Sequence, residues 1–176
     1  NYLKSIKNRV EIKNMIETHI KDGVAVTKFL YWIKNSNIKK LDEIKVEKKL
    51  ESFRKQSKSY LFPSFSTIAG SGPNGAIIHY RSNVKSNRKL NKDHLLLVDS
   101  GGQYKWGTTD ITRTISFSDP SKKTKELYTR VLKGHIAVAM SKIDKLKNGN
   151  NIDKLARKSL NSCLLYTSDA ADDLLC

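Results

Sequence analysis

The apolar residues of the first part of the chain recur at helical spacing. From about Asn8 to Asn35 an apolar residue returns every three or four positions, which is the period of one helix face. The pattern predicts one long amphipathic helix, in which Gly23 is a weak but tolerated position. Its apolar stripe begins with Ile12, Ile16, Ile20 and Val24 and continues, after a slight rotation, with Val26, Phe29, Leu30 and Ile33.

A second helix is predicted from Asp42 to about Gln56. Asp42 is of the residue type that caps helix N-termini, and Glu43 would lie in the first turn, where acidic residues are enriched. The side chains that we expect to face inward are Ile44, Leu50 and Phe53.

The pattern changes from helical to extended after Tyr60. Residues alternate from Pro63 to Ile68 as in a strand, the glycine-rich segment 70–75 predicts a turn, and a second strand is expected over 76–80. The polar segment 81–91 predicts a loop.

A short apolar run, Leu95 to Val98, predicts a strand that is buried on both faces. Gly101 and Gly102 would turn the chain, and the segment rich in β-branched residues from Thr109 to Phe117 would return as the neighbouring strand.

Two further helices are expected after Pro120, one from about Ser121 to Ile143 and a shorter one from residue 151 or 153 to 160. The order of elements predicts an α+β fold, with helices on one side of a mainly antiparallel sheet. The inner face of the longer helix would consist of Leu127, Val131, Leu132, Ile136 and Met140.

The net charge of +16 raises the possibility of a polyanionic partner. The 26 Lys and 7 Arg are spread along the chain, however, and no basic motif interleaved with aromatic residues accompanies them. Lys, Asn and Ile, which all have A- and T-rich codons, are abundant. Genome composition therefore explains the charge at least as well as function does, and nucleic acid is not the expected partner. The chain has no run of about eighteen apolar residues, so no membrane span is predicted.

The last fifteen residues differ in composition from the rest. Lys, Asn and Ile make up 54 of 176 residues but are missing from 162–176. That segment resembles a translated sequencing adapter, so we expect native sequence over 1–161 and a non-native tail over 162–176; a genuine acidic tail is the alternative. Cys163 and Cys176 both lie in this tail and form neither a disulfide framework nor a metal knuckle, which is compatible with a cytoplasmic protein. Because the chain starts at Asn1 without an initiator Met, we expect it to begin inside a longer polypeptide or after processing.

Two aspartates lie on either side of the predicted turn between these strands. Asp99 follows the apolar run directly, and Asp110 lies eleven positions later on the returning strand. A hairpin would bring the two carboxylates together, where they repel each other unless a cation lies between them. A divalent metal with oxygen ligands would relieve this repulsion. An Asp-Ser-Gly segment at a strand end is also common as a turn in which Asp bonds its own backbone, and spacing alone leaves both interpretations open.

The segments around these aspartates resemble the metal motif of the M24 metallopeptidases, in particular their Xaa-Pro aminopeptidase (aminopeptidase P) branch. The resemblance runs in order from about Lys4 to Leu160 and is carried by residues 6–8, 20–25, 72–80, 97–104, 107–114 and 131–137. One departure is Trp106, which stands where the family commonly has Asp. The resemblance implies a pita-bread fold, of which this chain would be the N-terminal half.

The resemblance also implies a dinuclear metal site built from two Asp, one His and two Glu. Asp99 would chelate one ion and Asp110 would bridge both; the ions would be divalent, Mn²⁺ foremost, with Zn²⁺ or Co²⁺ as alternatives. His79 would hydrogen-bond the substrate near the scissile bond, although it could instead be satisfied by a backbone group. Thr112 would orient a carboxylate without binding metal, or be a plain strand residue.

The function implied is release of the N-terminal residue from peptides with proline in the second position, through attack by a metal-activated hydroxide. The family's His and its two Glu ligands lie downstream of the region matched, so we expect this chain alone to be inactive. Intact family members are often homodimers. A prolidase-type dipeptidase and a non-catalytic pita-bread binding module remain the alternatives.

Overall fold

The computed structural model describes residues 2–142 and 148–161. It divides into two compact units, Asn1–Ser118 and Asp119–Cys176.

The first unit opens with helices that are capped by local side chains. A short helix, α1 (Tyr2–Ser5), precedes the long α2 (Arg9–Lys34), where Asn8 and Glu11 form a capping box. A 3-10 turn, η1 (Ile38–Lys40), leads to α3 (Glu43–Arg54), and the Asp42 carboxylate accepts from the Lys45 backbone N–H at 2.9 Å. Both predicted helices, and the predicted cap of the second, are therefore confirmed.

In the described part of the chain, six strands form two antiparallel sheets. One sheet has the order β1 (Tyr60–Pro63), β4 (Gly102–Tyr104), β5 (Gly107–Thr108). The other has the order β2 (Ile68–Ser71), β3 (Leu96–Ser100), β6 (Ile111–Ile115). The 3-10 segment η2 (Gly72–Ala76) follows β2, and the loop over 81–91 is present as predicted.

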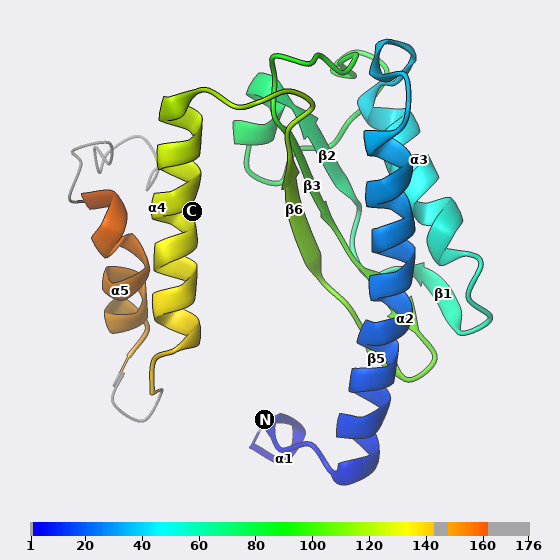
Figure 1. Ribbon diagram of the computed structural model, residues 1–176. Coiled ribbons are helices and arrows are strands. Elements are labelled where there is room, and N and C mark those ends of the chain that lie inside the picture. The colour runs from blue at the N-terminus through cyan, green and yellow to red at the C-terminus, as the bar shows by residue number, and fades with distance from the viewer. Residues whose placement is uncertain (1, 143–147, 162–176) are drawn as a thin grey trace. The chain divides into compact units, whose positions relative to one another are not determined.

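Helices α2 and α3 lie side by side over one face of the β2–β3–β6 sheet (Figure 1). On β3, Leu96 and Val98 face these helices and are buried, whereas Leu97 and Asp99 alternate onto the opposite face and are half-buried. The sheet thus has one apolar face under α2 and α3 and an opposite face that carries Asp99, a predicted metal ligand. The core consists of Val26, Phe29, Ile33, Val46, Leu50, Ala69, Leu90, Leu96, Val98 and Ile115.

Several strand predictions are wrong. The segment 63–68 spans the end of β1 and the start of β2. The segment 76–80 is a turn, because Tyr80 N–H donates to the Ile77 carbonyl at 3.2 Å and the Tyr80 side chain is held by Glu43. The strand β3 is fully buried on one face only. The chain reverses at Lys105 and Trp106 instead of Gly101–Gly102, so that the β4–β5 hairpin lies between Asp99 and Asp110.

The stripe predicted on α2 is buried only in its second half. Phe29 and Ile33 belong to the core, but Ile12, Ile16, Ile20 and Val24 are 49%, 57%, 63% and 52% exposed. The buried positions of α2 before Ala25 are instead Thr18 and Asp22. Thr18 lies against Gly107 of β5, and Asp22 accepts hydrogen bonds from the hydroxyls of Tyr104 and Thr109. On α3, Leu50 is buried as predicted, Ile44 and Phe53 are half-buried, and the buried Val46 was missed.

The second unit contains α4 (Lys122–Ala139), capped by Ser121, and α5 (Gly149–Asn161). The two helices meet closely at Gly134, where an added Cβ would lie 2.1 Å from the Ala156 carbonyl oxygen. Both helices were predicted, although the predicted end at Ile143 lies outside the described residues. The expected inner face of α4 is not buried, since Val131, Leu132, Ile136 and Met140 are all exposed.

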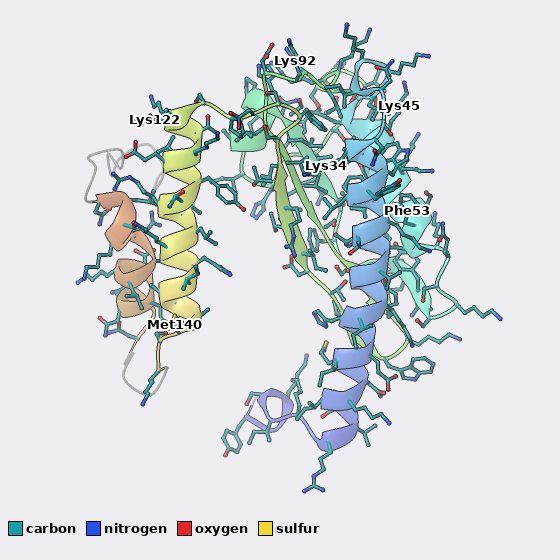
Figure 2. The ribbon with its side chains drawn as sticks, in the orientation of Figure 1. Lys34, Lys45, Phe53, Lys92, Lys122 and Met140 are labelled. Carbon is teal, nitrogen blue, oxygen red and sulfur yellow. The ribbon has the colours of Figure 1, made fainter. Side chains whose placement is uncertain are left out.

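The lysines lie on separate elements, as the sequence indicates. Lys34, Lys45, Lys92 and Lys122 are exposed and come from α2, α3, the loop before β3 and α4 (Figure 2). None of the helices in the described ranges is long and apolar enough to cross a bilayer.

Candidate metal centre

The pairing of β3 with β6 brings three of the predicted site residues together. Asp99 on β3 is the direct partner of Thr112 on β6, and the Thr112 hydroxyl donates to Asp99 Oδ1 at 2.8 Å. Asp110 precedes Thr112 by two positions and so falls on the same face as Asp99 and Thr112. This is the face turned away from α2 and α3.

The two carboxylates interact with each other. Partial desolvation raises the pKa of Asp110, and the charge of Asp99 and a hydrogen bond to it raise that pKa further. Paired carboxylates that oppose each other's ionisation are a donor set that suits a hard divalent cation, whose charge would stabilise both ionised forms. Within the described ranges no third His, Cys, Asp or Glu joins them to complete a metal cluster.

Within the described residues, His79 makes no hydrogen bond to Asp99, Asp110 or Thr112. It lies in the turn after η2, is exposed, and has a φ of 53°, in the left-handed region that non-glycine residues seldom adopt. Its neighbour Tyr80 is only 5% exposed, so the turn is anchored at the next residue while the imidazole lies outside the core.

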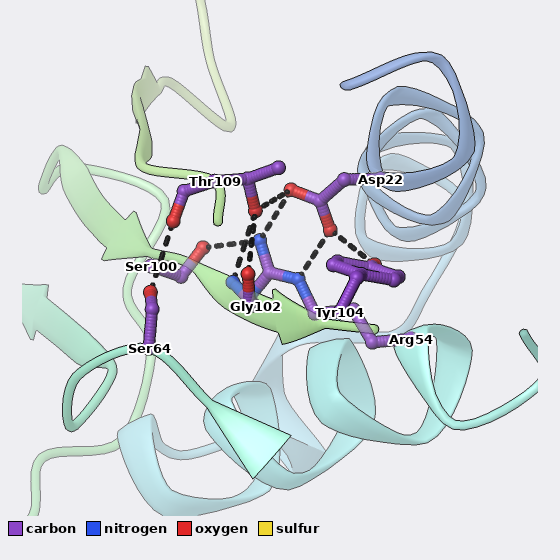
Figure 3. A network of polar contacts seen from close by, with 7 residues as sticks. All are labelled: Asp22, Arg54, Ser64, Ser100, Gly102, Tyr104 and Thr109. Carbon is purple, nitrogen blue, oxygen red and sulfur yellow. Dashed lines mark hydrogen bonds and ion pairs between the residues drawn. The ribbon is translucent and has the colours of Figure 1, made fainter. Parts of the chain in front are cut away.

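The sequence analysis missed a buried ion pair, Asp22–Arg54, which contacts Ser100 and Thr109 (Figure 3). Arg54 donates through Nε to Asp22 Oδ1 at 2.6 Å and through Nη2 to Oδ2 at 3.1 Å, and the two side chains are 2% and 0% exposed. Burial alone would raise the pKa of Asp22, but Arg54 and the hydroxyls of Thr109 and Tyr104 outweigh it, so that this pKa is lowered.

A second buried network is centred on Glu43, which is 0% exposed. Its Oε1 accepts from the Ser71 backbone N–H at 2.7 Å and from Asn74 Nδ2 at 3.0 Å. Its Oε2 accepts from the Tyr80 hydroxyl at 2.7 Å and from the Arg88 backbone N–H at 3.0 Å. This carboxylate therefore ties together the end of β2, η2 and the residue next to His79.

The sequence contains an indication that Asp22 and Arg54 are buried, although not that they pair with each other. Asp22 lies one helical turn before the buried Val26, and Arg54 one turn after the buried Leu50, so each charge is in register with the apolar face of its helix. A charge on such a face is either exposed at the helix end or paired inside the protein.

Comparisons with known proteins agree with this architecture. The model of metallopeptidase family M24 matches residues 13–170. The chain is 46% identical over 160 residues to "Xaa-Pro aminopeptidase ApepP" of Drosophila melanogaster, covering 90% of this chain and 26% of that protein. It is 43% identical over 164 residues to "Aminopeptidase P2" of Arabidopsis thaliana, covering 90% and 23%.

Solved structures show the same fold. An X-prolyl aminopeptidase of Caenorhabditis elegans, a cytosolic enzyme with a di-nuclear active site, superposes with a TM-score of 0.80 at 32% identity and covers 90% of this chain and 26% of that one. A prolidase of Pyrococcus furiosus superposes with a TM-score of 0.73 at 25% identity, covering 90% and 44%. The predicted α+β, pita-bread fold of the N-terminal half is confirmed. The chain spans about a quarter of the length of the curated relatives it matches.

Proposed function

Because the chain belongs to metallopeptidase family M24, we propose that it is part of an Xaa-Pro aminopeptidase, which releases the N-terminal residue from peptides with proline in the second position. The observation that carries the proposal is the convergence of Asp99 and Asp110 on the free face of the β3–β6 pair. The relatives with 40–46% identity are named as aminopeptidases P, which supports this branch.

Asp99 and Asp110 would hold the divalent ions through their carboxylate oxygens, with Asp110 shared between two ions. When bound, such ions lower the pKa of a water molecule to near neutrality and polarise the scissile carbonyl. Thr112 donates to Asp99 Oδ1 and so restricts the rotation of this carboxylate. We propose Mn²⁺ as the ion, with Zn²⁺ or Co²⁺ as alternatives.

His79 is proposed to hydrogen-bond the peptide near the cleaved bond. Its imidazole is exposed and therefore accessible to a substrate, and its backbone has the uncommon left-handed conformation that often occurs at functional positions. Tyr80, the residue that follows His79, is held in place by the hydrogen bond that its hydroxyl donates to Glu43 at 2.7 Å.

The chain alone is proposed to lack activity, because the described residues supply two oxygen-donating aspartates and no third ligand. Incubation of the 176-residue chain with Mn²⁺ and an Xaa-Pro peptide should release no N-terminal residue. Robust turnover by this chain would contradict the assignment of a site with further ligands.

Sequencing the transcript past residue 161 provides a second check, since a continuation with a Gly-His-Gly segment and two Glu is expected. The boundary at residue 161 itself stays a prediction.

Two other functions are less well supported. A prolidase-type dipeptidase is consistent with the fold likeness to the Pyrococcus furiosus prolidase, but at 25% identity that likeness is weaker than the identity to the aminopeptidases P. In a non-catalytic binding module of the same fold, the two aspartates would have no chemical reason to converge. A cytoplasmic location, a homodimeric state and independence from nucleic acid and membranes remain part of the proposal.

A further inference from the structure

The Asp22–Arg54 ion pair links α2 and α3 in the interior of the first unit, and both side chains are shielded from solvent. An ion pair of this kind has to overcome the cost of removing two charges from water, so that apolar replacements of similar volume are often equally stable. Its presence therefore suggests a role besides stability.

The pair contacts the residue next to each candidate metal ligand. Arg54 Nη2 donates to the hydroxyl of Ser100, which directly follows Asp99, at 3.1 Å. The Thr109 hydroxyl, directly before Asp110, donates to Asp22 Oδ2 at 2.8 Å. Ser100 and Thr109 are each 1% exposed. The ion pair thus holds both chain segments through the residues that adjoin Asp99 and Asp110 (Figure 3).

The two segments are also packed against each other without spare room. The Gly102 backbone N–H donates to the Thr109 hydroxyl at 2.9 Å, and Ser64 Oγ donates to the Thr109 carbonyl at 2.9 Å. A Cβ added at Gly101 would lie 2.0 Å from that carbonyl oxygen. A change in the position of Thr109 must therefore move Asp110 relative to Asp99.

We propose that Asp22 and Arg54 are positioning residues, which set the separation of the Asp99 and Asp110 carboxylates by fixing Ser100 and Thr109. The inference rests on the proposed metal site, because separation matters only if one ion must contact both carboxylates. Groups that orient metal ligands from behind contribute about 10- to 100-fold to metal affinity.

The test uses Mn²⁺ and the intact protein that contains this chain, with free Mn²⁺ quantified by its electron paramagnetic resonance signal. Thr109→Val removes the hydroxyl at nearly constant volume, whereas Thr109→Ser keeps it. Arg54→Lys keeps the positive charge but cannot form both hydrogen bonds to Asp22. The Kd for Mn²⁺ should rise about tenfold in Thr109→Val and in Arg54→Lys. In Thr109→Ser it should stay within about twofold of the parent value.

Glu43→Gln is the matched control, since Glu43 is as buried as Asp22 but contacts neither aspartate's neighbour. It should lose stability and leave the Kd for Mn²⁺ within about twofold. If Thr109→Val and Arg54→Lys fold and bind Mn²⁺ as the parent does, or if Glu43→Gln weakens binding as much as they do, the positioning role is wrong.

Amide hydrogen exchange gives a second measurement that needs no metal. Thr109→Val should accelerate exchange at 99–102 and 109–112 at least about tenfold more than at 71–80, and Glu43→Gln should give the opposite pattern. A uniform increase in both variants would overturn the inference. An intact parent protein that binds Mn²⁺ no better than its Asp99→Asn, Asp110→Asn double variant would refute the proposed metal site instead, and the exchange pattern would then decide the positioning role alone.

Discussion

Replacement of Glu43 by glutamine tests the buried network under the His79 turn. Four donors meet this carboxylate: the backbone N–H groups of Ser71 and Arg88, the Asn74 amide and the Tyr80 hydroxyl. A glutamine can keep one oxygen acceptor, but its NH₂ group then faces at least one backbone N–H that has no other acceptor in the network. An unpaired buried donor costs about 1–3 kcal/mol, and the remaining bonds lose their ionic character.

The free energy of unfolding should therefore fall by about 2–4 kcal/mol in Glu43→Gln, a large share of the stability of a domain of this size. Urea unfolding followed by circular dichroism measures it. Glu47→Gln is the control on the same helix, since Glu47 is half-buried and its one described side-chain bond is from Ser82 at 3.2 Å. The control should lose less than about 1 kcal/mol. A loss in Glu43→Gln no larger than in Glu47→Gln would refute the view that Glu43 organises the turn.

Two further predictions concern the pH dependence and the glycines. Because the folded pKa of Asp22 lies below its ordinary value of 3.8, its contribution to stability is complete above that value and is lost as the pH falls through the folded pKa. Asp22→Asn should thus flatten the fall in urea midpoint between about pH 5 and pH 2, and an unchanged slope would contradict this. Gly101→Ala should lose about 1–3 kcal/mol, since its Cβ would meet the Thr109 carbonyl, whereas Gly23→Ala, with open space in mid-helix, should gain about 0.5–1 kcal/mol. Thermal melts that rank the two alanine variants in the reverse order would show that the packing around Gly101 is looser than described.

Helices were predictable where the causes are local. The period of apolar residues and the cap at Asp42 lie within a few residues of the helix that they specify, and α2 and α3 begin and end close to the expected positions. The exposed Ile12 and Ile16 show the limit of this reasoning, because a stripe does not reveal whether a partner covers it.

The strands were predicted less well because their limits depend on distant contacts. Glycine is typical of turns, yet Gly101 is needed because a side chain at this position would collide with residue 109. The chain reverses instead at Lys105–Trp106, two residues that are not typical of turns. The segment 76–80 has an apolar pattern typical of a strand, but the bond from Tyr80 to Glu43, 37 residues away, folds it as a turn.

The candidate site was predictable in its aspartates and not in its support. Asp99, Asp110 and Thr112 belong to one strand pair and one motif, so sequence places them together. The Asp22–Arg54 pair joins residues 32 apart, and Thr109 reaches Asp22 across 87 positions. No local pattern contains such pairings, and only the fold brings them into contact.

The proposed function is tested most plainly by the hydrolysis of an Xaa-Pro peptide by the intact protein that contains this chain. With Mn²⁺ bound, the N-terminal residue should be released, and a chelator should abolish the release. Asp99→Asn should reduce kcat/KM by about 100-fold or more, since a lost metal ligand removes several kcal/mol of transition-state stabilisation. A metal-loaded intact protein that does not cleave before proline, or an Asp99→Asn variant that cleaves as well as the parent, would contradict the assignment.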